Sequence, residues 1–208
     1  VRMIHFGSGA QYDKRRPLVK IKEEQLGESI PTDDYGLSKF TIARYTQSRP
    51  DILTLNIFGL YGKYENYRQK FISNAIVKKL ANMPIVINQD VCFDYLYIND
   101  FCGIVYEYMT HFSGGRCVNI STTESILLSR AAAIIDKILG GEPYRILKSG
   151  LNHEYTADNA RMMKDIPEFR FTSYEEGIRE LIDYYSSCKA SLDFEAVLQD
   201  NYLKRVQK

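Results

Sequence analysis

The 208-residue sequence predicts an α/β protein built on a parallel sheet. A short apolar run, Arg2–Phe6, stops at the glycine-containing turn Gly7–Ala10, as a buried strand ending in a turn does. A second run, Ile52–Phe58, is apolar on nearly both faces, which is typical of a central parallel strand covered by helices. With a helix between them, the two runs form a βαβ unit, expected to be right-handed.

The helix of this unit carries the first functional signal. One of residues 32–34 can cap the helix, and the Arg-Pro-Asp break at residues 49–51 ends it. Tyr35 and Lys39 are four residues apart and therefore share a helix face, where the ammonium favours the phenolate form of the tyrosine. Together with the hydroxyl of Ser8, they suit acid–base chemistry on an alcohol or ketone.

Two other Tyr-x-x-x-Lys pairs occur in the chain. Tyr144 and Lys148 lie in a predicted strand, and Tyr185 and Lys189 lie where a helical pattern ends. Neither has a hydroxyl placed upstream, and an isolated pair of this kind is usually an exposed helix pair. The preceding strand and serine therefore single out the pair that contains Tyr35.

Beyond the tyrosine-rich loop at residues 59–67 the predicted elements become shorter and more mixed. They are helices at 71–80, 100–109, 129–139 and 173–185, and strands at 84–87, 93–98, 117–120 and 144–147. A Ser/Thr-x-x-Glu capping box opens the helix at 173. Residues 189–208 have helical apolar spacing, which predicts a face that docks onto this chain or a second copy.

Composition excludes several classes of function. The 27 basic and 26 acidic residues nearly balance, so the chain lacks an electrostatic footprint for nucleic acid or an anionic membrane. No apolar run approaches the ~20 residues that span a bilayer. The four cysteines show no Cys-x-x-Cys spacing and lie far from the three histidines, so we expect no metal site and buried, reduced cysteines in a cytoplasmic protein.

Five segments in fixed order resemble motifs of the NAD-dependent epimerase/dehydratase family, extended short-chain dehydrogenases/reductases that act mostly on nucleotide-activated sugars. They are Gly7–Asp13, Tyr35–Lys39, Leu55–Gly62, Phe93–Asp100 and Cys117–Ser121. The resemblance extends from Met3 to about Tyr185. It implies the later part of a Rossmann-type parallel sheet with a small mixed α/β substrate-binding region.

The implied organisation has three regions. Residues 1–67 would be the C-terminal part of an NAD(P)-binding Rossmann domain that contains the catalytic helix. Residues 68–188 would be mainly substrate-binding, with some segments returning to the Rossmann core, and residues 189–208 a C-terminal helical tail. Members of the family often dimerise through helices of the catalytic region, so a homodimer is expected.

The resemblance also implies roles for individual residues. Tyr35 would be the general acid/base, Lys39 would contact the nicotinamide ribose of NAD or NADP, and Ser8 would position the substrate oxygen. The backbone near Phe58 would contact the nicotinamide end of the cofactor.

The substrate side of the site is implied less completely. Asn74 could face the sugar, and Arg161 could contact its diphosphate; ordinary helix-surface positions are the alternatives. The family's dehydratases carry an Asp-Glu pair where this chain has Gly9 and Ala10, which disfavours dehydration. Phe93 replaces an arginine that often holds the diphosphate, so a charge-assisted contact is missing there.

The glycine-rich loop that cradles the cofactor pyrophosphate has no counterpart in the sequence. The expected function is therefore an NAD(P)-dependent epimerase or reductase of a nucleotide-activated sugar, present as a chain that lacks the pyrophosphate-binding half and is inactive alone. Two alternatives stay open: a non-catalytic scaffold or binding protein with a degenerate cofactor site, and a reductase of other small carbonyl substrates.

Overall fold

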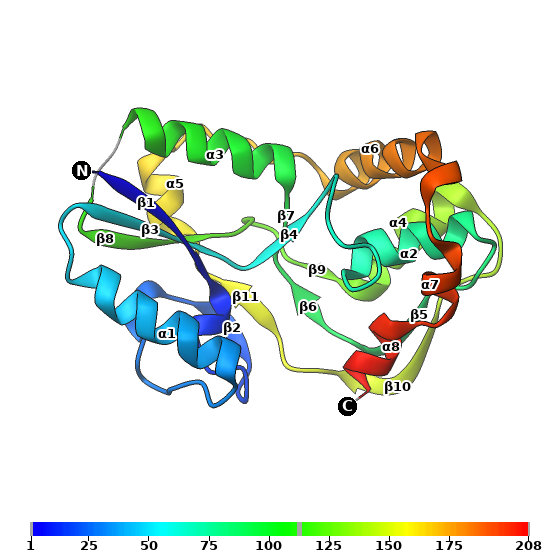
Figure 1. Ribbon diagram of the computed structural model, residues 1–208, viewed down its shortest axis with the longest axis horizontal. Coiled ribbons are helices and arrows are strands. Elements are labelled where there is room, and N and C mark those ends of the chain that lie inside the picture. The colour runs from blue at the N-terminus through cyan, green and yellow to red at the C-terminus, as the bar shows by residue number, and fades with distance from the viewer. Residues whose placement is uncertain (1, 112–113, 208) are drawn as a thin grey trace. The chain divides into compact units, whose positions relative to one another are not determined.

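The computed structural model describes residues 2–111 and 114–207. The chain forms two compact units (Figure 1), each assembled from three separate segments. The first unit comprises Val1–Leu60, Phe93–Ser125 and His153–Phe171. The second comprises Tyr61–Cys92, Ile126–Asn152 and Thr172–Lys208.

The first unit contains a three-stranded parallel sheet in the order β1-β3-β8. Its elements are β1 (Met3–Ser8), η1 (Gly9–Gln11), β2 (Leu18–Ile21), η2 (Glu23–Gln25), α1 (Asp34–Gln47), β3 (Ile52–Ile57), β7 (Tyr95–Tyr97), α3 (Ile98–Thr110), β8 (Arg116–Ile120), β11 (Tyr155–Ala157) and α5 (Ala160–Asp165). The parallel pairing of β1 with β3 around α1 confirms the predicted βαβ unit. Ser8, Ile57 and Ile120 share one register position, so the carboxyl ends of the three strands lie level.

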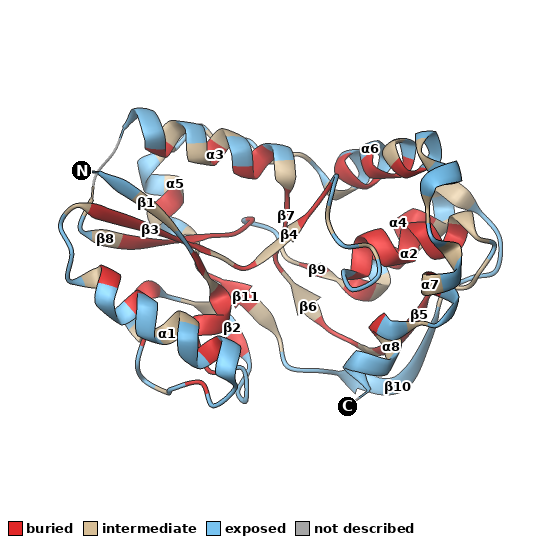
Figure 2. Cartoon of the chain, viewed as in Figure 1, coloured by how far each residue is buried: buried red, intermediate tan, exposed pale blue. Residues whose placement is uncertain are grey.

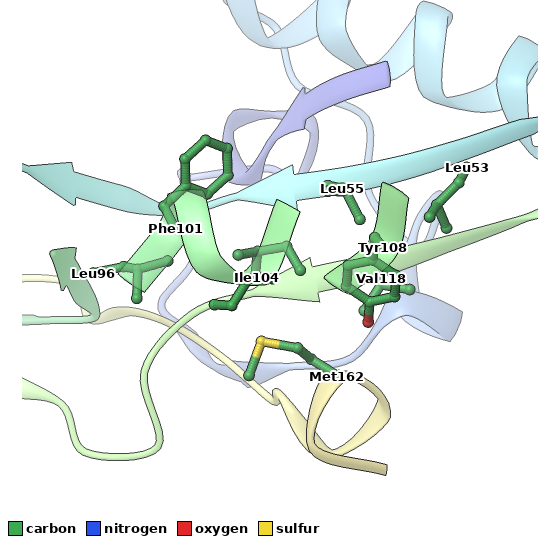
Figure 3. Close-up of a cluster of buried hydrophobic side chains, with 9 residues drawn as sticks. Leu53, Leu55, Leu96, Phe101, Ile104, Tyr108, Val118 and Met162 are labelled. Carbon is green, nitrogen blue, oxygen red and sulfur yellow. The ribbon is translucent and has the colours of Figure 1, made fainter. Parts of the chain in front are cut away.

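One hydrophobic cluster of this unit lies on one face of the sheet (Figure 3). Leu53 and Leu55 of β3 pack with Ile104 of α3 and Met162 of α5, all essentially inaccessible to solvent. On the opposite face of β3, the hydroxyl of Thr54 meets that of Thr46 from α1 at 2.9 Å. The strand is therefore buried on both faces, as its apolar sequence predicts.

One stretch with the polar composition of a loop contains regular structure. The segment between Arg16 and Pro31 is a polar loop by sequence, yet Leu18–Ile21 form β2, which pairs in parallel with β11. The partner strand is more than a hundred residues away in the sequence. Pairing of this kind comes from tertiary structure and overrides a weak local pattern.

The second unit is mainly helical around a two-stranded parallel sheet, β5-β10. Its elements are α2 (Phe71–Leu80), β5 (Val86–Asp90), β9 (Ile126–Leu127), α4 (Leu128–Leu139), β10 (Arg145–Leu151), α6 (Tyr174–Ser187), η3 (Lys189–Ser191), α7 (Phe194–Leu198) and α8 (Asn201–Val206). Two short strands, β4 (Gly59–Tyr61) and β6 (Cys92–Phe93), each contain a point where the chain passes from one unit to the other. Figure 2 shows α2 buried over most of its surface and β10 exposed along its length.

Local signals at the helix ends agree with the structure. The side chain of Asp33 caps α1 by accepting a hydrogen bond from the Gly36 amide at 2.9 Å. Ser173 and Glu176 form the predicted capping box of α6. The tail helices dock onto their own chain, where Val197 and Tyr202 are buried and the Tyr202 ring packs on Phe71.

Within the described residues, none of the helices has the length and apolar character needed to cross a bilayer. The four cysteines are free thiols. Cys117 is buried as expected, but Cys102 is exposed, because it lies on the solvent side of α3 rather than on the side that faces the sheet. In the same described ranges, no group of three or more histidine, cysteine or acidic side chains could hold a metal ion.

Candidate active site at the end of β1

The site begins where β1 ends and the chain turns through η1. Ser8 is the last residue of the strand, and its Oγ accepts a hydrogen bond from the Ala10 amide at 3.2 Å. The first turn of α1 packs directly on this turn. A Cβ added to Gly36 would lie 2.9 Å from the carbonyl oxygen of Ala10 and 2.7 Å from Cβ of Pro31. The glycine after Tyr35 therefore allows the start of α1 to approach the serine turn.

Tyr35 and Lys39 lie one turn apart on α1, as their spacing predicts. The Nζ atom of Lys39 is 5.7 Å from the centre of the Tyr35 ring. The tyrosine is 56% exposed, so a substrate or cofactor can reach its phenol. Among the described residues, no carboxylate forms an ion pair with Lys39, and its ammonium is available to act on Tyr35 or on a bound hydroxyl.

His5 adds a titratable group beside the lysine. It lies on β1, three residues before Ser8, and its Nδ1 is buried and has no hydrogen-bond partner among the described residues. Burial, together with the charge of Lys39, lowers the pKa of His5. The imidazole is therefore held neutral, and the positive charge at this point belongs to Lys39.

Tyr155 is a member of the site that the sequence patterns do not reveal. Its phenol has the Ser8 side chain as a hydrogen-bonding neighbour, and its ring packs on Phe58 with 5.1 Å between centroids. Burial raises its pKa, and the nearby phenols of Tyr35 and Tyr12 raise it further. Tyr155 reaches the site because β11 pairs with β2, and no motif or period around residue 155 marks it.

Phe58 forms an apolar wall of the site. It is nearly buried and lies between the rings of Tyr12, at 6.0 Å, and Tyr155. Its position directly after β3 places it near the carboxyl ends of the sheet strands, where ligands of open parallel sheets bind. The predicted contact between its backbone and a cofactor stays a prediction.

The two predicted substrate residues lie elsewhere. Arg161 on α5 donates to the carbonyl of Cys117 at 2.8 Å and pairs with the carboxylate of Glu24. Asn74 belongs to the second unit, where its amide donates to the carbonyl of Tyr67 at 3.0 Å. Ser8, Tyr35, Lys39 and Phe58 thus gather within one unit, whereas substrate contacts by Asn74 and Arg161 stay predictions.

Comparison with known proteins identifies the family of this chain. A sequence model of the NAD dependent epimerase/dehydratase family matches residues 1–121, more than half of the chain. The chain belongs to the NAD-dependent epimerase/dehydratase family. Members of this epimerase/dehydratase family are enzymes, and β1, α1 and β3, next to which Ser8, Tyr35, Lys39 and Phe58 lie, are within the matched residues, whereas Tyr155 is not.

Individual relatives are distant and longer. The dTDP-glucose 4,6-dehydratase of Escherichia coli is 26% identical over an alignment 196 residues long, which covers 83% of this chain and 53% of that protein. A UDP-glucuronic acid 4-epimerase from Bacillus cereus, solved with UDP-glucuronic acid and NAD, has a TM-score of 0.75 at 21% identity and covers 90% of this chain and 62% of its own.

A GDP-L-fucose synthetase from Naegleria fowleri bound to NADP has a TM-score of 0.73 at 13% identity, with 89% of this chain and 66% of that chain covered. These structural likenesses confirm the α/β fold with parallel strands. The chain spans about half the length of its curated relative and less than two thirds of the B. cereus structure.

Proposed function

We propose that this chain is the catalytic portion of an NAD(P)-dependent enzyme that epimerises or reduces a nucleotide-activated sugar. The observation that carries the proposal is the convergence of Ser8, Tyr35 and Lys39 at the carboxyl end of a parallel strand. The nucleotide-sugar enzymes among its structural neighbours support the substrate class.

The residues present fit one end of a nicotinamide cofactor. Lys39 would hold the nicotinamide ribose, and Tyr35 and the backbone near Phe58 would line the ring. When bound, NAD or NADP supplies a reversible hydride acceptor for the substrate carbon. The neighbours solved with NAD and with NADP support either form of the cofactor.

The protein side of the reaction is proton transfer. Tyr35, in its phenolate form, would take the proton from the substrate hydroxyl and return it when the ketone is reduced. Lys39 would place its positive charge one helix turn from Tyr35, and Ser8 would donate a hydrogen bond to the same substrate oxygen.

The structure supports epimerisation or reduction over dehydration. A Cβ added to Gly9 would lie 2.4 Å from Oη of Tyr155 and 2.7 Å from Cδ1 of Phe58. An acidic side chain therefore has no room at this position. The curated relative is a dehydratase, but the space beside Ser8 in this chain is filled by two aromatic rings.

A reductase of non-sugar carbonyls is the second candidate. Phe93 stands where family members often carry a phosphate-binding arginine, and its ring packs at 5.5 Å from Tyr155 and 5.2 Å from Tyr95. This aromatic surface favours an apolar substrate more than a diphosphate.

A homodimer is also part of the proposal. Leu37, Ile42 and Tyr45 of α1 are exposed apolar residues on the helix that carries the catalytic pair. Light scattering after size-exclusion chromatography tests this directly, and a monomeric complete protein would contradict it.

Calorimetry with NAD(H) and NADP(H), on this chain and on the complete gene product, tests the proposed function. Cofactor binding by the complete protein, with turnover of UDP- or dTDP-sugars, would support it. Turnover of simple ketones and not of sugar nucleotides would favour the second candidate. If the complete protein binds neither cofactor, the enzyme proposal is wrong, and a scaffold or binding protein is left.

A further inference from the structure

We propose that Tyr155 is a positioning residue that orients the hydroxyl of Ser8 toward the substrate oxygen. The proposal deepens the function proposed above, and its activity test rests on that function. Its structural test does not. Tyr155 does not move the proton itself; it acts through Ser8.

The phenol of Tyr155 lies against the turn that contains Ser8. The 2.4 Å between Oη of Tyr155 and a Cβ added to Gly9 shows that this oxygen lies directly against the residue that follows Ser8. Only a glycine leaves space for the phenol there. The Tyr155 phenol therefore fits against the turn after Ser8, although the two segments are distant in the sequence.

The packing around the Tyr155 ring prevents it from moving away from the Ser8 turn. It is packed against Phe58 at 5.1 Å and against Phe93 at 5.5 Å. The Tyr155 carbonyl accepts a hydrogen bond from the amide of Asp94, and the Asp94 carboxylate in turn accepts one from the Ala157 amide at 2.7 Å. The strand that carries Tyr155 is therefore fixed on both sides of the residue.

The Ser8 hydroxyl can take part in a limited number of hydrogen bonds. A serine hydroxyl has one proton to donate and two lone pairs that accept. The Ala10 amide already donates to Oγ of Ser8. Burial raises the pKa of Tyr155, so its phenol keeps its proton and can donate as well. In this proposal Tyr155 donates to the second lone pair of Ser8, so the one remaining hydroxyl proton of Ser8 is left for the substrate oxygen.

The two tyrosines near Ser8, Tyr35 and Tyr155, then have different roles. Tyr35 is exposed and accompanied by an ammonium, so it is suited to gain and lose a proton. Tyr155 is enclosed by aromatic rings, so it is suited to hold one. A serine with a fixed orientation stabilises the transition state without reorganising during the reaction.

The structural test uses the Tyr155→Phe variant of the 208-residue chain, which keeps the ring and removes only the hydroxyl. NMR couplings of selectively labelled Ser8 report its side-chain rotamer. We expect one rotamer in the parent chain and averaged couplings in the variant. The Tyr12→Phe variant is the matched control, because that phenol packs on the same Phe58 but bonds to Asn119. An unchanged Ser8 rotamer in Tyr155→Phe would overturn the proposal.

The activity test is a double-mutant cycle in the complete gene product. Tyr155→Phe should lower kcat about tenfold with little change in KM, as expected for the loss of one orienting hydrogen bond. In a Ser8→Ala background the same change should have no further effect. Losses that multiply in the double variant would show that Tyr155 acts independently of Ser8. If the complete protein turns nothing over, the proposed function fails while the rotamer measurement still decides this inference.

Discussion

The carboxylate of Glu65 accepts a hydrogen bond from the hydroxyl of Ser73 in the first turn of α2. The residue that begins this helix, Lys70, provides no side-chain cap, and backbone amides of Gly62 and Ser73 also donate to Glu65. Glu65, in the loop before α2, thus acts as the cap of this helix, although it lies five residues before the N-cap position at Lys70. Burial outweighs these contacts and raises the pKa of Glu65 to about 7.

This carboxyl should make stability depend on pH near neutrality. Its ordinary pKa is 4.5, so between about pH 4.5 and 7 the folded chain keeps a proton that the unfolded chain has lost. Folding stability should therefore fall as pH rises through this window and level off above it. Urea unfolding at pH 5 and pH 8 measures the difference. Glu65→Gln should reduce it, whereas Glu195→Gln, at an exposed position, should leave it unchanged.

Tyr35→Phe should abolish turnover without harming the fold. General acid–base catalysis contributes about 10² to 10⁴ in rate, and the Tyr35 hydroxyl is exposed, so its loss removes chemistry and little packing. Tyr45→Phe on the same helix is the control, because Tyr45 is similarly exposed but ten residues further along α1. Turnover by the complete protein and circular dichroism provide the two measurements. Retention of more than a tenth of the activity would contradict the assigned role.

Gly9→Asp should destabilise the first unit and should not create a dehydratase. The new side chain would meet Oη of Tyr155 and the ring of Phe58, an overpacking that costs about 1–3 kcal/mol. Gly103→Ala is the control: a Cβ there would sit 3.5 Å from the Phe169 ring, an ordinary contact, and alanine favours the helix by about 0.5–1 kcal/mol. Thermal unfolding compares the two variants. Equal melting temperatures would show that the space beside Ser8 is not restricted.

The buried ion pair between α2 and the C-terminal tail should contribute more to the free energy of unfolding than an exposed ion pair does. Nζ of Lys78 lies 2.7 Å from Oδ2 of Asp200, and the lysine side chain is 2% exposed. Asp200→Asn keeps the cap of α8 and tolerates the left-handed backbone at φ 47°, but leaves the ammonium unpaired. We expect a loss of about 2–3 kcal/mol, below that of a fully buried pair because Asp200 is partly exposed.

Asp193 provides the matched control for this measurement. It caps α7 as Asp200 caps α8, and it pairs with Arg68 at 2.7 Å in an exposed position. Asp193→Asn should therefore cost less than about 1 kcal/mol. Chemical unfolding of both variants, with limited proteolysis of the tail, gives the comparison, and similar losses would mean that burial of Lys78 adds nothing.

Local signals in the sequence predict much of this fold. The cap at Asp33, the break after α1 and the apolar run of β3 are all properties of neighbouring residues, and the structure confirms each one. The same is true of α2, whose predicted bounds match the observed ones. The Tyr35–Lys39 geometry follows from helix periodicity alone.

What the sequence does not reveal depends on distant pairing. Tyr155 enters the site through β11, whose partner β2 lies in a stretch that is polar by composition. Glu65 acquires its perturbed pKa from burial, which no motif encodes. The predicted boundaries at residues 67 and 188 divide the chain in sequence and stay a prediction about functional regions, whereas the compact units are interleaved.

This interleaving determines how the molecule can be taken apart. The chain passes between the units five times, after residues 60, 92, 125, 152 and 171. Neither unit is a continuous stretch, so no single truncation yields one of them free of segments of the other. Each unit can form only after segments that are far apart in the sequence have packed together, and proteins with such non-local contacts fold slowly for their size. A nick after residue 92, 125 or 152 would divide both units between the two fragments, and a domain-deletion experiment on this protein would have to rejoin three pieces of chain.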